Sequence, residues 1–393
     1  MNSPLTGAWL KCREGGIPTL MEIAPLLKGF DPTAALMALA ITSVVLWLLH
    51  PLAQRLGLLD YPAGRKDHAV PTPVTGGVAI FLGCVVSFFA LQTHSNSLMA
   101  FSAAATLVVV VGIYDDLRDL RWQWRILAQS VAALIIIYWG GVRVEQLGPL
   151  FGLGEMSLGY LSVPFTIFAT VGLINAMNMI DGADGMAGLL GLAALVMLDG
   201  AAIYAGNVAL AERLSVLCGG LAGFLAWNIR LPWRPRARVF LGNAGSALLG
   251  LVIAWVAFRL TQNPGHPVNP VLALWLLPIP VMDCLVLIVR RLHEGRSPFS
   301  PGHDHIHHLM QAAGFGPTRA AMWLTAFTLV CGLLAGQAMR LDVPHPVLLV
   351  AFLMLCVGWY LLTRKSARAI AFFRALRGSR AEPSAKVIEN TRP

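Results

Sequence analysis

The chain of 393 residues is 56% hydrophobic and only 12% charged, with a mean hydropathy of +0.67. Soluble domains carry about twice that share of charged residues, so the composition excludes an ordinary soluble protein and indicates a polytopic helical membrane protein. The formal net charge is +9, but the basic residues are dispersed and no DNA- or RNA-reading motif is present, which excludes nucleic-acid binding.

The cysteines and the N-terminal residues add two expectations. Five of the six cysteines lie inside apolar runs and only Cys12 lies outside them, so neither a metal-binding pair nor a disulfide framework is predicted. The first thirty residues lack a compact apolar segment followed by a cleavage site, and we therefore expect no signal peptide.

Apolar runs of about 17–22 residues predict eleven membrane-spanning helices. In chain order they lie near residues 33–51, 75–93, 98–114, 126–140, 161–177, 186–206, 214–229, 244–261, 270–289, 320–339 and 345–363. We expect an all-α fold in three parts: an extracytoplasmic N-terminal segment over 1–32, a transmembrane domain over 33–363 and a basic cytoplasmic tail over 364–393.

Lysine and arginine residues divide the loops into two sets. Loops that follow the odd-numbered spans, together with the C-terminal tail, hold most of them, whereas the other loops hold few. The positive-inside rule places the first set and the C-terminus in the cytoplasm and the N-terminus outside. The basic residues before the first span run weakly against this orientation.

The tail permits two interpretations. Residues 367–377 combine arginines with apolar side chains, which is typical of a basic amphipathic helix on anionic lipid. A topogenic positive end followed by disorder is the alternative, and we expect disorder after Gly378.

Unusual polar clusters occur in five loops, all on the side assigned to the cytoplasm. In the first, Lys66 and His68 are suited to phosphate oxygens, and Gly76 and Gly77 permit a close backbone approach where the second span begins. An ordinary anchor loop with topogenic charges is the alternative.

Three acidic residues follow the third span. Asp115 and Asp116 lie at a helix C-terminus, where the helix dipole disfavours negative charge, so a divalent cation is a natural partner. Asp119 lies four residues after Asp115 and would share its face. The alternative is a solvated acidic loop balanced by Arg118 and Arg121.

The third loop holds the densest polar motif. Two amides and two carboxylates recur at every third residue: Asn175, Asn178, Asp181 and Asp184. This spacing would place them along one face of a helix. Ionisable groups at the end of a membrane span are costly, which makes them functional candidates. The alternative is that Asp181 or Asp184 caps the next helix.

The fourth loop runs from Asn228 through four arginines to a glycine-rich segment around Asn243. Asn228 lies at a helix end, where an amide can cap the helix or contact a base. The glycines indicate a close approach at Asn243, and the alternative is a helix N-cap by Asn243 or Ser246.

The fifth loop has four histidines within six positions, from His303 to His308. Histidine binds metals, and it binds phosphate when protonated. A zinc site is the competing interpretation, but no cysteine is nearby and the acids and amides of the other loops suit a hard cation better. A solvated histidine-rich loop is the third alternative.

Taken together, these motifs resemble the polyprenyl-phosphate N-acetylhexosamine-1-phosphate transferase superfamily, of the glycosyltransferase family 4 type. The resemblance covers residues 65–315 and rests on several motifs in the family's order. They are the Pro-Thr-Pro…Gly-Gly segment before the second span, Asp115-Asp116, Asn175…Asn178…Asp181-Gly-x-Asp184-Gly, Phe240-Leu-Gly-x-Ala-Gly-Ser246 and His305-Ile-His307-His308. Asp119 and the Ser297-Pro-Phe-Ser-Pro301 segment are more similar to the undecaprenyl-phosphate GlcNAc-1-phosphate branch.

This resemblance implies an activity at the inner face of the bacterial cytoplasmic membrane. A polyprenyl phosphate, expected to be undecaprenyl phosphate, would attack the β-phosphorus of a UDP-sugar, expected to be UDP-GlcNAc. UMP would leave, and the lipid-diphospho-sugar would start a cell-envelope polysaccharide such as O-antigen. The implied cofactor is Mg²⁺, with Mn²⁺ as a substitute, and a homodimer is a candidate assembly.

The resemblance also implies roles for individual residues. Asp115, Asp116 and Asp181 would be catalytic, with Asp115 deprotonating or positioning the lipid phosphate. Asp181 and Asn243 would hold the metal. The residues implied to contact the nucleotide-sugar are Lys66, Asp119, Asn178, Asp184, Asn228, His305, His307 and His308.

One position departs from the family pattern. The fourth motif of the family carries Asp where this chain has Asn243, and an amide offers an oxygen without the negative charge. A homologue of low activity is therefore one alternative, and a transporter or flippase of a lipid-linked anion is another. Transporters place charged residues at mid-membrane on broken helices, whereas the clusters here lie at span ends.

Overall fold

The computed structural model describes residues 29–61, 70–93, 95–152, 154–262, 268–297 and 304–378. Within these ranges the chain is helical almost throughout. The regular strands there are the two-residue β1 (Leu59–Asp60) and β2 (Thr72–Pro73), which pair antiparallel. The predicted all-α fold class is confirmed.

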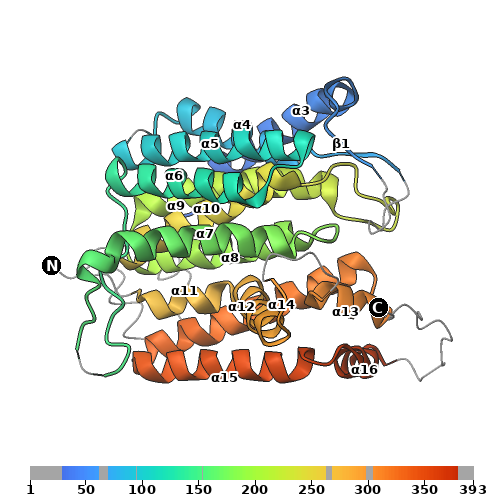
Figure 1. The fold of residues 1–393 in the computed structure, drawn as a ribbon. Coiled ribbons are helices and arrows are strands. Elements are labelled where there is room, and N and C mark those ends of the chain that lie inside the picture. The colour runs from blue at the N-terminus through green and yellow to red at the C-terminus, as the bar shows by residue number, and fades with distance from the viewer. Residues whose placement is uncertain are drawn as a thin grey trace, which may run out of the picture.

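Fourteen α-helices and one 3₁₀ turn make up the described fold, arranged as a bundle (Figure 1). They are α3 (Pro32–Leu56), α4 (Gly76–Ala90), α5 (Asn96–Arg118), α6 (Trp122–Tyr138), η1 (Gly159–Leu161), α7 (Ser162–Ile180), α8 (Met186–Tyr204), α9 (Val208–Asn228), α10 (Gly242–Thr261), α11 (Pro270–Leu276), α12 (Pro278–His293), α13 (Ile306–Ala312), α14 (Pro317–Arg340), α15 (His345–Thr363) and α16 (Ser366–Arg377).

Each of the eleven predicted spans overlaps one of these helices or, at 270–289, a broken pair. The count of eleven is not confirmed, however. Among the described residues, eight helices are long and apolar enough to cross a membrane: α3, α5, α7, α8, α9, α10, α14 and α15. The pair α11 and α12, bent by 90°, would make nine, whereas α4 with 15 residues and α6 with 17 are shorter.

Helix α10 is the core of the bundle, with 89% of its most apolar stretch buried. Small residues allow its first turn to touch two neighbouring helices. A Cβ on Gly77 of α4 would overlap the Gly245 backbone, and one on Gly112 of α5 would overlap Ala244. Contacts between small residues are how membrane helices approach closely. The paired glycines before the second span therefore bring α4 against the start of α10.

Backbone hydrogen bonds fix the same junction. The N–H groups of Gly76 and Gly77 donate to the carbonyl oxygens of Phe240 and Leu241, both at 3.0 Å, and the Phe240 N–H donates to Pro73 at 2.8 Å. The first N–H groups of a helix have no partner within it, so the segment before α10 supplies partners to α4. The first and fourth polar loops are thus joined.

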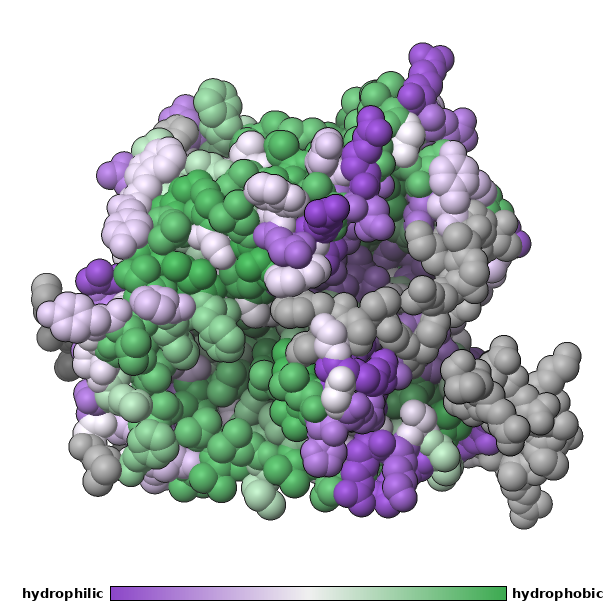
Figure 2. Space-filling model, in the orientation of Figure 1, coloured by the Kyte–Doolittle hydropathy of each residue, from purple (hydrophilic) through white to green (hydrophobic). Residues whose placement is uncertain are grey.

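Polar residues gather at one end of this bundle. In Figure 1, β1, α13, α16 and the chain turns after α7 and after α9 all lie at that end. Figure 2 shows hydrophobic residues over most of the visible face and hydrophilic residues around a hollow near the same end. The predicted convergence of the polar loops is therefore observed, while the membrane side that this end faces stays a prediction.

The close contact at Gly112 predicts a stability cost. Gly112→Ala should lower the free energy of unfolding by about 1–3 kcal/mol, because the added methyl group forces α5 away from the start of α10. Gly358→Ala in α15 is the matched control, since a Cβ there meets open space. Thermal and denaturant unfolding in detergent measures both; equal midpoints for the two variants would contradict the proposed packing.

Candidate active site

Asp115 is the most buried of the three acids at the end of α5, with 4% of its surface exposed. Its carboxylate accepts a hydrogen bond from the Leu120 N–H at 2.8 Å and is paired with Arg125 of α6 at 3.1 Å. Arg125, rather than the Arg118 and Arg121 named in the sequence alternative, thus compensates this charge. Asp119 caps α5 in a left-handed conformation and is exposed.

Asp116 joins α5 to the start of α10. Its Oδ1 accepts the N–H of Asn243 at 3.0 Å, where a helix N-terminus favours a carboxylate. Gly242 adopts a left-handed φ of +74°, and a Cβ there would lie 2.8 Å from Asp116 Oδ2. Asp116 Oδ2 is buried and has no hydrogen-bond partner within the described residues. The alternative interpretation, an N-cap by Asn243 or Ser246, is wrong, because neither side chain caps α10.

Two amides extend this junction to α7. Asn178 Nδ2 donates to Asn243 Oδ1 and to Ser246 Oγ, both at 2.9 Å. One turn earlier, Asn175 Nδ2 donates to Gln129 of α6 at 2.7 Å. Interhelical amide bonds of this kind hold membrane helices together. Asn243 is therefore held by contacts from both α5 and α7.

The predicted helical stripe ends earlier than expected. Helix α7 stops at Ile180, so Asn175 and Asn178 are helical, whereas Asp181 and Asp184 lie in the turn before α8. The alternative, in which Asp181 or Asp184 caps the next helix, is wrong too. Gly185, with a φ of +80°, is the residue before α8, and no side chain caps that helix. Burial, and then the negative charges of Asp116 and Asp184, raise the pKa of Asp181 to about 7. Three carboxylates are thus close enough to repel one another, which suits a cation.

Contacts with the fourth loop hold this turn in place. Asp184 forms an ion pair with Arg230. Asn228 Oδ1 accepts the Gly185 N–H at 2.7 Å, and its Nδ2 donates to the Val239 carbonyl at 2.8 Å. The buried Asn228 side chain therefore joins two loops, with both of its polar atoms bonded inside the protein.

Residues 304–315, which we call the histidine segment, pack on the other side of this turn. His305 Nδ1 lies 2.8 Å from Asp283 of α12, which also accepts the Ile306 N–H at 3.2 Å. His307, 1% exposed, packs against Gly182 so closely that a Cβ there would overlap its ring. Proline residues at 278 and 280 accompany the 90° bend that carries Asp283 to this position.

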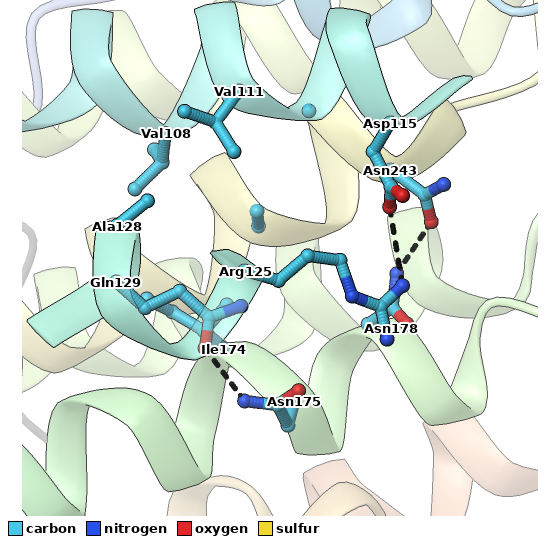
Figure 3. A pocket seen from close by; sticks show the side chains of 12 residues that line it. Val108, Val111, Asp115, Arg125, Ala128, Gln129, Ile174, Asn175, Asn178 and Asn243 are labelled. Carbon is cyan, nitrogen blue, oxygen red and sulfur yellow. Dashed lines mark hydrogen bonds and ion pairs between the residues drawn. The ribbon is translucent and has the colours of Figure 1, made fainter. Parts of the chain in front are cut away.

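A narrow pocket lies beside the junction (Figure 3). Asp115, Arg125, Asn178 and Asn243 meet at one end of it, and Asn175 and Gln129 lie further along. Its remaining lining is mostly small or apolar: Val108, Val111, Gly112, Ala128, Ile174 and Ala247. The pocket thus offers a polar end that continues into an apolar one.

A second cavity, of about 450 Å³, opens between the first and fourth loops. Its lining includes Asp184, Arg230, Arg236, Arg238 and His50. The Arg238 guanidinium lies 5.8 Å from the ring centre of Trp227, at cation–π distance. This basic cavity has the charge to receive a polyphosphate.

The structure places the predicted site residues as follows. Hydrogen bonds join Asp116 to Asn243 and Asn243 to Asn178, and Asp115 lines the same pocket as the two amides. Asp181 and Asp184 lie in the adjoining turn, which His307 contacts at Gly182. His305 and His308 neighbour His307, with His307 and His308 ring centres 4.1 Å apart. Asp119 is exposed at the end of α5, and Lys66 lies outside the described residues.

Sequence reasoning missed three contributors. Arg125 and Arg230 were counted only for topology, although each pairs with a predicted acid. Asp283 fell inside the predicted span 270–289, where an ionisable residue in an apolar run is itself a signal.

The donor set is compatible with a hard cation. The described residues contain no group of three His, Cys, Asp or Glu side chains arranged for a metal. Within the described residues Asp116 Oδ2 has no hydrogen-bond partner, Asp181 lies near two other carboxylates, and Asn243 adds an amide oxygen nearby. Mg²⁺ is commonly held by one or two carboxylates and completed by substrate phosphates and water, so these three residues fit it.

Comparison with known proteins places the chain in a family. The profile of glycosyl transferase family 4 matches residues 98–261. The undecaprenyl-phosphate alpha-N-acetylglucosaminyl 1-phosphate transferase of Escherichia coli O157:H7 is 32% identical over 317 residues, which are 80% of this chain and 85% of that protein. The protein of that name from Yersinia pestis is 31% identical over 330 residues, 84% and 90% of the two chains. The chain belongs to glycosyl transferase family 4.

The matched region of this family 4 protein runs from α5 to α10. It contains Asp115, Asp116, Asn178, Asp181 and Asn243, which are the residues that the interhelical contacts bring together. The family resemblance drawn from the motifs is thereby confirmed. The histidine segment lies beyond the profile, although contact with Gly182 brings it to the same site.

Proposed function

We propose that this family 4 protein transfers a sugar-1-phosphate, most simply GlcNAc-1-phosphate, from a UDP-sugar to undecaprenyl phosphate, with release of UMP. The observation that carries the proposal is the placement of two different pockets around one acidic cluster. Asn243, bonded to Asp116, lines the partly apolar pocket, and Asp184, beside Asp181, lines the basic cavity. The names of the relatives supply the substrate classes.

The partly apolar pocket suits the lipid phosphate. Arg125 lies at its polar end, paired with Asp115, and presents a guanidinium that can bind a phosphate in a bidentate manner. The apolar residues of its lining come from α5, α6, α7 and α10, and they suit the first carbons of an isoprenoid chain. Asp115 would hold Arg125 and position the phosphate oxygen for attack.

The basic cavity suits the nucleotide. Arg230, Arg236 and Arg238 supply positive charge to a diphosphate, and Asp184 holds Arg230 in place. Trp227, beneath Arg238, offers an aromatic surface close by. The histidine segment would approach the diphosphate from the Gly182 side, because His307 packs against that glycine.

In the reaction, an oxygen of the lipid phosphate forms a bond to the β-phosphorus of the UDP-sugar. The bond from this phosphorus to the oxygen bridging the two phosphates breaks, and that oxygen leaves with UMP. Both reactants are anions, so bringing them together is mainly an electrostatic problem. Arg125 and the arginines of the cavity would lower the repulsion from opposite sides.

A bound Mg²⁺ would neutralise charge on the phosphates. Asp116, Asp181 and Asn243 are the residues that would hold it. The Asp116 carboxylate also accepts the backbone N–H of Asn243, and Asn178 donates to the side-chain oxygen of Asn243. The fold therefore positions the oxygen atoms that would bind the metal. The proposed location is the inner face of the bacterial cytoplasmic membrane, at the first step of a cell-envelope polysaccharide.

The activity itself is tested with purified protein, polyprenyl phosphate, Mg²⁺ and a panel of UDP-sugars. UMP release is expected, and Asp115→Asn and Asp181→Asn should each reduce turnover by about 10² or more. Asp199→Asn is the control, because Asp199 is a buried acid of α8 away from these pockets. Lipid flux without UMP would favour a flippase instead, and near-normal rates in both site variants would remove these acids from the mechanism.

The two pockets predict separable effects on the two substrates. Arg125→Gln should raise the KM for the lipid phosphate by about tenfold, as expected for the loss of a charge-assisted contact of about 1.5 kcal/mol. It should leave the KM for the UDP-sugar unchanged. Arg238→Gln should instead raise the KM for the UDP-sugar and leave the KM for the lipid phosphate unchanged. Arg118→Gln, an exposed arginine at the end of α5, serves as control. If both site variants raised the KM for the same substrate, the pocket assignment would be wrong.

The neutral side chain of Asn243 predicts that the natural chain binds Mg²⁺ weakly. Asn243→Asp should lower the Mg²⁺ concentration for half-maximal activity by about tenfold, because an added charge near a cation is worth a few kcal/mol before repulsion from Asp116 and Asp181. Asn207→Asp, at the cap of α9, is the remote control. UMP release by Asn243→Asp alone would mean that the natural chain is a low-activity homologue, and an unchanged Mg²⁺ dependence would place Asn243 outside the metal site.

A further inference from the structure

The C-terminal helix α16 has a composition unlike the rest of the bundle. It follows α15 after only Arg364 and Lys365, and Figure 1 shows it beside α13 at the polar end. Residues 364–377 contain five basic side chains and no acidic one. The predicted amphipathic helix is therefore formed, and all of its charged side chains are positive.

The inner face of α16 packs on the histidine segment, residues 304–315. Ala369 and Phe373 are buried. The Phe373 ring meets Phe315 edge to face, with ring centres 6.5 Å apart and planes at 85°. This geometry is favourable for aromatic pairs, so α16 is attached to the end of the segment that carries His305, His307 and His308.

Arg377 strengthens this attachment. Its Nη1 donates to the carbonyl oxygen of Gly314 at 2.8 Å and to that of Ala313 at 3.4 Å. Both residues directly follow α13, and a basic side chain is favourable at a helix C-terminus. Gly314 has a φ of +92°, and a Cβ there would overlap the Arg377 guanidinium. Glycine at this position both allows the turn and leaves room for the arginine.

The opposite end of the histidine segment is joined, through Arg290, to the end of α15. Arg290 of α12, 6% exposed, donates to the Thr363 carbonyl at 3.0 Å, at the end of α15. The same guanidinium is paired with Asp304 at 3.2 Å, directly before His305. Movement of the α15–α16 corner would therefore be transmitted to both ends of the segment.

The outer face of α16 is suited to a membrane surface. Phe372 and Leu376 lie one turn apart and are 49% and 45% exposed. Lys365 and Arg374 are exposed as well. Apolar side chains flanked by basic ones, at the end of a membrane helix, match the boundary of an anionic bilayer in both polarity and charge.

We propose that α16 lies on anionic lipid headgroups and that this contact positions the histidine segment over Gly182. Arg377 is then a positioning residue, since it acts through α13 and not on a substrate. The consequence for turnover rests on the proposed function. The consequence for the order of the histidine segment does not.

Hydrogen–deuterium exchange on the full-length protein in nanodiscs tests this proposal. Neutral phosphatidylcholine discs are compared with discs containing about 30% phosphatidylglycerol, and exchange of residues 304–315 and 366–377 is followed together with UMP release. Anionic lipid should slow exchange in the histidine segment of the natural chain by about fivefold for each basic residue that reaches the surface.

Three variants and one control decide the outcome. Lys365→Gln/Arg374→Gln should remove the lipid dependence without disturbing the fold, because both side chains are exposed. Arg377→Ala should abolish the lipid effect on residues 304–315 while leaving it on α16, and Arg377→Lys should recover part of it. Arg340→Gln, an exposed arginine at the far end of α14, should behave as the natural chain.

Equal exchange in both lipids, or a lipid effect on residues 304–315 that persists in Arg377→Ala, would overturn the proposal. Absence of UMP release in every disc would refute the proposed function alone, because the exchange measurement requires no activity.

Discussion

The hydrogen bond from the Asn243 N–H to Asp116 is the contact on which the rest of the site depends. It joins the end of α5 to the start of α10, the most buried helix, and Asn178 extends the junction to α7. A carboxylate at a helix N-terminus is favourable, whereas a carboxylate at the C-terminus of its own helix is not. The fold therefore offsets an unfavourable feature of α5 with a favourable feature of α10.

The glycines explain how that contact is reached. Gly77 and Gly112 let α4 and α5 approach the first turn of α10, and Gly242 turns the chain beside Asp116. Larger residues would separate the helices by the width of a side chain, and a hydrogen bond cannot span that distance. Close packing of small residues and the polar junction are thus two aspects of one arrangement.

Three negative charges meet around Asp181, and positive groups surround them at a distance. Arg125 approaches from α6 and Arg230 from the fourth loop, each paired with a different acid. Within the described residues Asp181 has no such ion-pair partner, and burial, together with the negative charges of Asp116 and Asp184, raises its pKa. A site of this kind is prepared for a cation and for anions held by the outer arginines, which is the charge arrangement that phosphoryl transfer requires.

The sequence by itself determined the membrane class, the all-α fold, the family and the residue types of the site, because hydropathy, charge bias and motif order are local properties of the chain. It did not determine where α7 ends or which groups compensate Asp115, and the roles of Arg125 and Asp283 could not be predicted. These features depend on which helices touch. Arg125 reaches Asp115 from a different helix, and His305 reaches Asp283 from outside α12. The attachment of α16 to the histidine segment likewise joins residues 63 positions apart. Contacts of that range are set by packing between helices, which no local pattern encodes.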